Sequence, residues 1–302
     1  MLKQKYYVLP AGYIDSQGVL HKEVELTPLT GREEELLANY HYPTAALVTE
    51  VLERCVKRIG TIESVTPSLL RELLVADRQY LLLMLRQLTF GDRIQATLLC
   101  PWPHCGKGVD IDFLISDVPI SPCDHEKYYS LNIEKFPDAQ ALGLGSESFM
   151  QVRYRLPNGH DQEAFSDTSR ANDVLAITTL LSRCIIKFGC INHPTAEWLL
   201  QLPPAVRLRI EQEMEARAPN LELTMEAECP ECKRSFIAPF ELQDFFFGEL
   251  KVGTELLFRE VHYLAFHYHW SEQEIMNMSR ERRRRYIETL SSEIEKLNDR
   301  IE

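Results

Sequence analysis

The chain has 302 residues, of which 45% are hydrophobic and 26% charged, and its formal net charge is −12. This composition is typical of a globular protein with a substantial core, and the length predicts about two domains. The negative charge argues against general binding to nucleic acid or anionic membranes, because both attract positively charged proteins.

The sequence also lacks the signals of a membrane or secreted protein. No apolar run approaches the roughly 20 residues that span a bilayer, and residues 1–13 lack the apolar region of a signal peptide. We therefore expect a cytoplasmic protein. Disulfides are rare in the cytoplasm, so the eight cysteines are expected to serve as metal ligands and free thiols.

Two segments, about residues 13–118 and 146–247, carry the same order of predicted elements. Each begins with a strand of alternating polar and apolar residues that ends in a glycine turn. A short helix with an acidic start follows, and then an amphipathic helix over residues 46–60 or 174–189 with a terminal glycine as its C-cap. Further helical sequence and two strands around a cysteine pair complete each segment.

The two segments also match residue by residue. Residues 52–60 align with residues 181–189 at an offset of 129, and the same offset places Cys100 on Cys229. The second cysteine of each pair aligns after a slip of two residues. Unrelated amphipathic helices can resemble one another, but they would not keep cysteines in place over some ninety positions. The sequence therefore predicts a tandem repeat of one unit.

The expected fold class is α+β, with two duplicated units of helices plus a β-hairpin, joined by a zinc-ribbon-like site of four cysteines. A helical tail follows the second unit. The predicted parts are a first repeat over residues 1–118, a linker over 119–145, a second repeat over 146–247 and the tail over 248–302.

Two cysteine pairs are the strongest candidates for a site. Cys100 and Cys105 are separated by four residues, Cys229 and Cys232 by two, and a proline follows the first cysteine of each pair. Such turns aim both sulfurs at one point, and four thiolates fit the tetrahedral shell of Zn²⁺. A redox dithiol or buried free thiols are the alternatives. Four thiolates leave no position for water or substrate, so the predicted zinc is structural.

The tail is expected to contact a partner. Ser271 and Glu274 predict a capping box at the start of a short helix. Isoleucines and leucines then recur three and four residues apart, which is the spacing of a coiled-coil stripe that needs a partner surface. The predicted partner-binding residues are His262, Phe266, His269, Trp270, Ile287, Leu290, Ile294 and Leu297.

Two other features of the tail allow more than one interpretation. The spacing of His262, His267 and His269 is poor for joint metal ligation, so packing or partner contact is favoured over a second metal site. The arginine run over residues 280–285 could form a nucleic-acid or lipid patch. On an acidic protein, a solvated helix face paired with Glu281, Glu288 or an acidic partner is the preferred interpretation.

Nothing in the sequence indicates an enzyme. Asp77 and Asp92 could be imagined as paired carboxylates, but no nucleophile or base accompanies them. The phosphate-binding loop, the serine nucleophile elbow and the dinucleotide fingerprint are also absent from the sequence. We therefore expect no small-molecule substrate.

Several stretches together resemble a known family. They are LTGREEELL, VADRQYLLLMLRQLTFGD, RLPNGHDQEA, AECPECKRSFIAPFEL and the stretch that begins LLFREVHYLAFHYHW. In this order they are similar to the baseplate hub assembly chaperones of T-even-like phages, whose relatives occur with contractile tails and phage-tail-like injection systems.

The resemblance implies a non-enzymatic chaperone or minor hub subunit that binds hub or spike proteins in the bacterial cytoplasm, with retention in the finished particle left open. Residues 249–301 are expected to carry much of this contact. A permanent structural baseplate or tail-end adaptor is the alternative. A zinc-ribbon regulator that binds nucleic acid is disfavoured by the net charge of −12.

Overall fold

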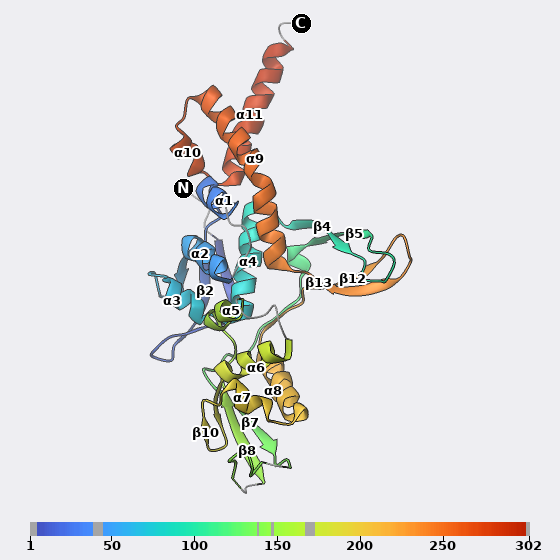
Figure 1. Cartoon of the computed structure of the whole chain (residues 1–302). Coiled ribbons are helices and arrows are strands. Elements are labelled where there is room, and N and C mark those ends of the chain that lie inside the picture. Colours follow the sequence, from blue (N-terminus) through green and yellow to red (C-terminus); the bar gives the residue numbers. More distant parts are fainter. Residues whose placement is uncertain (1–4, 39–44, 138, 146–147, 167–172, 300–302) are drawn as a thin grey trace.

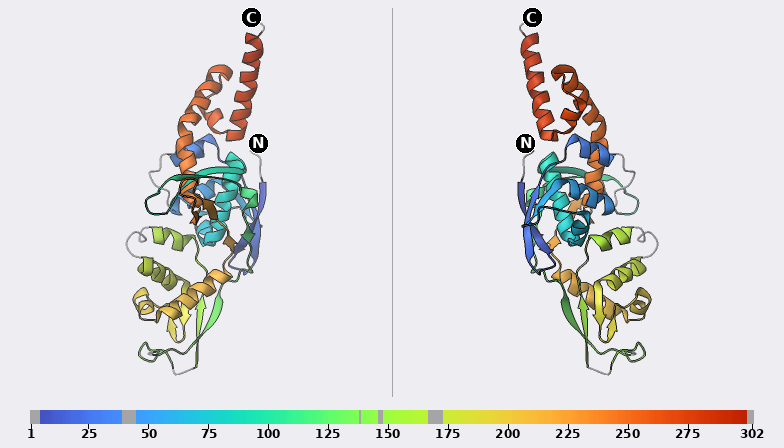
Figure 2. Two further views of the ribbon diagram at one scale, coloured as in Figure 1. Left: turned by 90° about the vertical axis from the view of Figure 1, so that its right-hand side faces the viewer. Right: turned by 90° about the vertical axis from the view of Figure 1, so that its left-hand side faces the viewer.

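The computed structural model describes residues 5–38, 45–137, 139–145, 148–166 and 173–299. Figure 1 shows an elongated molecule with one α+β body in the middle, a second body at one end and the helical tail at the other. Two β-hairpins project from the side of the middle body. The two further views in Figure 2 confirm that the tail and the second body lie at opposite ends. The expected α+β class is therefore confirmed.

The first body contains one antiparallel sheet and four helices. The strands are β1 (Lys5–Ile14), β2 (Leu20–Leu26) and β3 (Val56–Ile59), in the order β1-β2-β3. The helices are α1 (Gly31–Ala38), α2 (Ala45–Cys55), α3 (Pro67–Glu72) and α4 (Val75–Phe90). Apolar residues of β2, β3, α2 and α4 form its core, with Val24, Ile59, Leu52 and Leu81 fully buried.

The second body has the same kinds of element in the same order. Its sheet has the order β10-β9-β8-β7, from β7 (Tyr129–Glu134), β8 (Phe149–Tyr154), β9 (Ile185–Phe188) and β10 (Ile191–Asn192). Its helices are α5 (Gly159–Ser166), α6 (Asp173–Cys184), α7 (Ala196–Leu200) and α8 (Pro204–Arg217). Strand β7 lies within residues 119–145 and buries Tyr129, Leu131 and Ile133 in the second core. This segment therefore contributes to the second body as well as connecting the two.

The long amphipathic helices predicted over residues 46–60 and 174–189 were wrong in their last turn. Helix α2 ends at Cys55 and α6 at Cys184, and the next four residues are strands. These strands pair with their neighbours through Val24 opposite Ile59 and Val152 opposite Phe188. The first and fourth residues of each strand are buried. They are β-branched or aromatic, which suits a sheet, and the pairing outweighs the helical spacing.

The two bodies meet where α5 packs against α2, α3 and α4. The N–H of Gly159, the first residue of α5, donates to the carbonyl oxygen of Leu73 over 3.1 Å. The buried side chain of Arg78 donates from Nε to Gln162 on α5 (3.0 Å) and from Nη2 to the carbonyl oxygen of Ala45 (2.8 Å). Backbone and guanidinium contacts thus fix α5 on the first body.

This junction requires a glycine at position 159. A Cβ atom there would lie 2.7 Å from Nη1 of Arg78 and 2.8 Å from Cα of Arg71. Gly159→Ala should therefore lower the free energy of unfolding by about 1–3 kcal/mol, as overpacking does. Gly248→Ala is the matched control, because nothing lies within 4 Å of its Cβ position and alanine favours the helix. Thermal unfolding measures both, and equal stability of the two variants would contradict the prediction.

Two hairpins project from the bodies (Figure 1). One joins β4 (Arg93–Leu99) and β5 (Gly108–Leu114), and a 3₁₀ turn follows over Ile115–Asp117. The other joins β12 (Thr224–Glu228) and β13 (Ser235–Pro239). At their base, β6 (Ile120–Ser121) pairs with β11 (Asn220–Leu221) and ties the two chain segments together.

The tail contains α9 (Leu242–Tyr268), α10 (Glu272–Met276) and α11 (Arg280–Asn298). Helix α9 crosses the predicted boundary at residue 248 without a break, and its Phe246, Phe247 and Leu250 belong to the core of the first body. The capping box predicted at Ser271 and Glu274 is confirmed. No helix in the described parts of the chain combines the length and apolar character needed to cross a bilayer.

Candidate metal centre and partner surfaces

The four predicted cysteines come together at the tips of the two hairpins. Their sulfur atoms all lie within 4.8 Å of one another. Two sulfur–sulfur distances link the hairpins, 3.8 Å between Cys100 and Cys232 and 3.7 Å between Cys105 and Cys229. Among the described residues all eight cysteines are free thiols. Tetrahedral Zn–S bonds of about 2.3 Å would space the sulfurs about 3.8 Å apart, so the set fits a metal ion.

Both turns achieve this despite their different lengths. The N–H of Cys100 donates to the carbonyl oxygen of Lys107 (2.9 Å), and that of Cys229 donates to Arg234 (3.0 Å). Gly106 and Lys233, which directly follow the second cysteine of each pair, both adopt the left-handed conformation. The two extra residues of the first turn are therefore accommodated without displacing its sulfurs.

The surroundings of the sulfurs favour a structural role. Cys100 and Cys229 are buried in a small cluster with Val109 and Phe236. Burial raises the pKa of Cys100 to about 12, whereas the N–H of Cys232, which donates to its sulfur, lowers the pKa of Cys229 to about 7. Four adjacent thiolates repel one another unless a cation neutralises them, which a divalent metal would do.

The hairpin tips also touch through one aromatic residue outside the cysteine set. Trp102 donates from Nε1 to the carbonyl oxygen of Ser235 on the other hairpin (3.3 Å), and the guanidinium of Arg234 lies 5.4 Å from its ring centre. The sequence does not predict this contact, and the aromatic residue inside the first cysteine turn is the only signal for it.

The predicted partner residues of α9 lie in two environments. His262 and Phe266 are exposed, their rings stack at 6.4 Å, and Phe266 is 68% exposed. Phe258, one helical turn before His262, is also exposed and extends this stripe. His269 is exposed and ends α9 in the left-handed conformation. Trp270 instead packs on Tyr268 and Tyr286, with ring centres 4.6 and 4.8 Å apart, so it stabilises the tail itself.

The predicted stripe of α11 is covered progressively less along the helix. Ile287 packs on the tail core of α9 and α10. Leu290 and Ile294 are half-buried, and Leu297 is exposed. Ile301, the last member of the stripe, lies outside the described residues. Only the end of the stripe is therefore open to a partner.

The arginine run is partly solvated, as predicted: Arg282, Arg284 and Arg285 are exposed, and Arg285 pairs with Glu281. Arg283 is the exception to the predicted solvated face. Arg283 is fully buried and donates to Glu34 on α1 and Glu260 on α9, each over 2.9 Å. It also donates to the carbonyl oxygen of Met278. Burial raises the pKa of Glu34, so this carboxylate depends on the adjacent guanidinium for its charge. The network fastens the tail to the first body.

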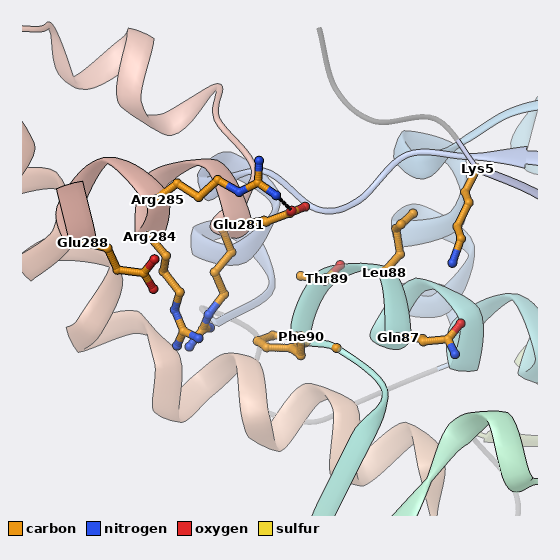
Figure 3. Close-up of a pocket in the computed structure, with 11 residues that line it drawn as sticks. Lys5, Gln87, Leu88, Thr89, Phe90, Glu281, Arg284, Arg285 and Glu288 are labelled. Atoms are coloured by element: carbon orange, nitrogen blue, oxygen red, sulfur yellow. Dashed lines mark hydrogen bonds and ion pairs between the residues drawn. The ribbon is translucent and has the colours of Figure 1, made fainter.

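Three of the other arginines, Arg280, Arg284 and Arg285, line a pocket of about 440 Å³ between α11 and the end of α4. Figure 3 shows Arg284 and Glu288 near Phe90, with Lys5 on the opposite side and Arg285 paired to Glu281. The guanidinium of Arg280 lies 4.8 Å from the centre of the Phe90 ring. The pocket can accept an anionic group, although two glutamates neutralise part of its charge.

Asp77 and Asp92 have separate structural partners. Asp77 is fully buried and accepts the N–H groups of Ala11 and Gly12 at 2.9 and 3.0 Å, and burial raises its pKa to about 6. Asp92 accepts the side-chain hydroxyl of Ser116 over 2.7 Å. Each carboxylate therefore stabilises a local chain arrangement.

Comparison with known proteins adds a family assignment. Residues 14–247 match the model of a family described as T4 bacteriophage base plate protein. Residues 250–302 match a family of unknown function (DUF6760). No curated protein and no solved structure matches the chain. The first match spans both bodies and both hairpins, and on that basis the chain belongs to the T4 bacteriophage base plate protein family.

Proposed function

We propose that the protein is a non-enzymatic assembly factor or minor hub subunit in the baseplate of a phage-like contractile tail or injection system. The family match over residues 14–247 is the observation that carries this proposal. Such a role requires a rigid body that presents surfaces to other proteins. The fixed α5 junction and the projecting tail and hairpins meet that requirement.

We further propose that Cys100, Cys105, Cys229 and Cys232 hold one structural Zn²⁺. The two cross-hairpin sulfur distances of 3.8 and 3.7 Å support this assignment. The ion would supply charge neutralisation and a cross-link between hairpins that are far apart in the sequence. Other tetrahedral thiolate metals, such as iron, share this donor set.

We infer that the two bodies arose by duplication of one unit. Thr66 and Thr195 both cap the N-terminus of the following helix through their side chains. Gly60 and Gly189 both turn the chain after a strand with positive φ. The irregularity between β2 and β3 at Glu25 also recurs between β8 and β9 at Arg153. Unrelated units would not share such details.

The exposed stripe of α9 is the proposed contact for hub or spike proteins. Deleting residues 249–301 is a poor test, because Leu250 is buried in the first core and Glu249 pairs with Arg86. Surface substitutions leave that core intact. The experiment therefore uses Phe258→Ser with Phe266→Ser in the full chain.

Co-expression with its complete baseplate gene cluster should give a native chain that retains hub or spike proteins through affinity purification. The double variant should retain less than about a tenth of them, because losing two exposed aromatic anchors costs binding energy at an interface. Ile237→Ser on β13 is the matched control, since Ile237 is 72% exposed but lies on a hairpin. Equal retention by both variants would place the contact elsewhere.

A permanent structural baseplate subunit is the second candidate. The family description, which names a base plate protein, favours it. Mass spectrometry of purified, sheathed particles separates the two roles. A stoichiometric chain in the particle indicates a subunit, and its absence indicates an assembly factor.

A further inference from the structure

Three segments of the chain share one local pattern. Each has a capping Thr or Ser and, twelve residues later, an arginine, as in Thr66–Arg78, Thr195–Arg207 and Ser271–Arg283. In each, the hydroxyl accepts the N–H of the third residue after it. The apolar residue four positions after the cap is fully buried in all three; these are Leu70, Leu199 and Ile275. The segments form α3–α4, α7–α8 and α10–α11.

In two of these segments the arginine holds a helix that belongs to another part of the chain. Arg78 binds Gln162 of α5, and Arg283 binds Glu34 of α1. Both docked helices begin with a glycine, and the bonded residue lies three positions later. The N–H of Gly159 donates to the carbonyl oxygen of Leu73, and that of Gly31 donates to that of Met278.

The glycine is needed in both docked helices because the chains approach closely. A Cβ atom at Gly31 would lie 2.9 Å from the sulfur of Met276 and 3.2 Å from its backbone. The corresponding atom at Gly159 would meet Arg78 and Arg71. A helix docked in this way therefore starts with glycine and carries Gln or Glu at its fourth residue. We call this a donor helix.

The third segment, α7–α8, has an arginine at the same position, Arg207, but no donor helix is docked on it among the described residues. Nε of Arg207 is buried without a hydrogen-bond partner there, whereas Nε of Arg78 is bonded to Gln162. A buried donor without an acceptor destabilises the folded chain. The side chain of Arg207 makes one long bond, 3.4 Å from Nη1 to the hydroxyl of Thr178.

The apolar side chains around Arg207 are correspondingly open. Ile177 on α6 is 42% exposed, whereas Val48, at the same position of α2 and covered by the α5 junction, is 2% exposed. An orphaned guanidinium nitrogen beside an apolar residue that is exposed here and buried in the first body matches a site from which the donor helix is missing.

We propose that the face formed by α6, α7 and α8 around Arg207 is a docking site for a donor helix of a partner protein. The partner helix begins with glycine, carries Glu or Gln three residues later, and has an apolar face that covers Ile177. Both donor helices of this chain, α1 and α5, are already docked, so a second protein supplies it. This site is separate from the α9 stripe and does not depend on the proposed baseplate role.

The test uses the full-length chain and a side-chain-stapled, fluorescent peptide with the sequence of residues 156–166, in which helicity is enforced. Fluorescence anisotropy should reveal saturable binding that Arg207→Ala weakens at least about tenfold, the effect of losing one charge-assisted hydrogen bond. A peptide with Gln162→Glu should bind more tightly, because it forms the ion pair that Arg283 forms with Glu34.

Arg209→Ala is the matched control, since Arg209 lies on the same helix with an exposed side chain and pairs only with Glu213 (3.8 Å) in the described structure. It should leave binding within about twofold of the native chain. Ile177→Asp, a surface change that retains the fold, should abolish binding even if Arg207→Ala unfolds. No saturable binding by the native chain, or equal binding by the Ile177→Asp variant, would overturn the proposal.

Discussion

Replacing Cys100 and Cys229 together with serine is expected to abolish metal binding and to separate the hairpin tips. The native chain should carry one zinc ion by elemental analysis, and the variant none. The cluster between the tips contains few apolar residues besides the cysteines. Zinc binding contributes about 10–16 kcal/mol of apparent free energy in small zinc-binding peptides, so the metal is expected to outweigh the contact of Trp102 with Ser235 between the tips.

The loss should be local. Amide hydrogen exchange at the cysteine-bearing ends of β4, β5, β12 and β13 should accelerate by orders of magnitude. The cores of both bodies, which include Ile94 of β4 but not the cysteine cluster, should stay protected. Cys190→Ser is the control, since Cys190 is exposed and lies outside the cluster. A variant that still carries one zinc, or slow exchange in metal-free hairpins, would refute a structural metal at these four residues.

Arg283→Ala should destabilise the protein by about 3–5 kcal/mol, the cost of removing one partner from a buried ion pair. The substitution leaves the Glu34 and Glu260 carboxylates buried next to each other without their shared guanidinium. We expect a lower unfolding temperature and faster hydrogen exchange in α1, α10 and α11, where the network fastens the tail.

Arg285→Ala is the matched control on the same helix. Its side chain is exposed and pairs with Glu281 one turn away, an interaction worth about 0–1 kcal/mol. Similar unfolding temperatures for the two variants would show that the buried network adds little stability.

The sequence predicted those parts of the fold that depend on neighbouring residues. The capping box at Ser271 depends on a side chain and a backbone group three residues apart. The convergence of the four cysteines could also be predicted, because two Cys-Pro turns have few chemical uses other than a shared metal. In both cases the chemistry of a few residues restricts the possible structures.

The pairing of strands that are far apart in the sequence escaped prediction. The strands at Val56–Ile59 and Ile185–Phe188 continue the apolar spacing of the preceding helices, and only the neighbouring strands convert them to sheet. Residues 128–133 of the linker did suggest a short strand, which is β7, but its pairing with β8 in the second sheet was not predicted.

The burial of Arg283 could not be predicted, because it is one of five arginines within six residues and such a run is typical of an exposed helix face. Its acceptor Glu34 is 249 residues away in the sequence. Only alignment with Arg78 and Arg207 could have indicated that it differs from its neighbours, and that alignment needs the three capped segments to be recognised first.

Helix α9 has a mechanical consequence. It starts three residues after β13 ends, passes through the first core and continues without interruption to Tyr268, a rod of about 40 Å at 1.5 Å per residue. One continuous helix therefore joins the second hairpin, the first core and the helical tail. A change in the direction of this helix would move the tail relative to the hairpins.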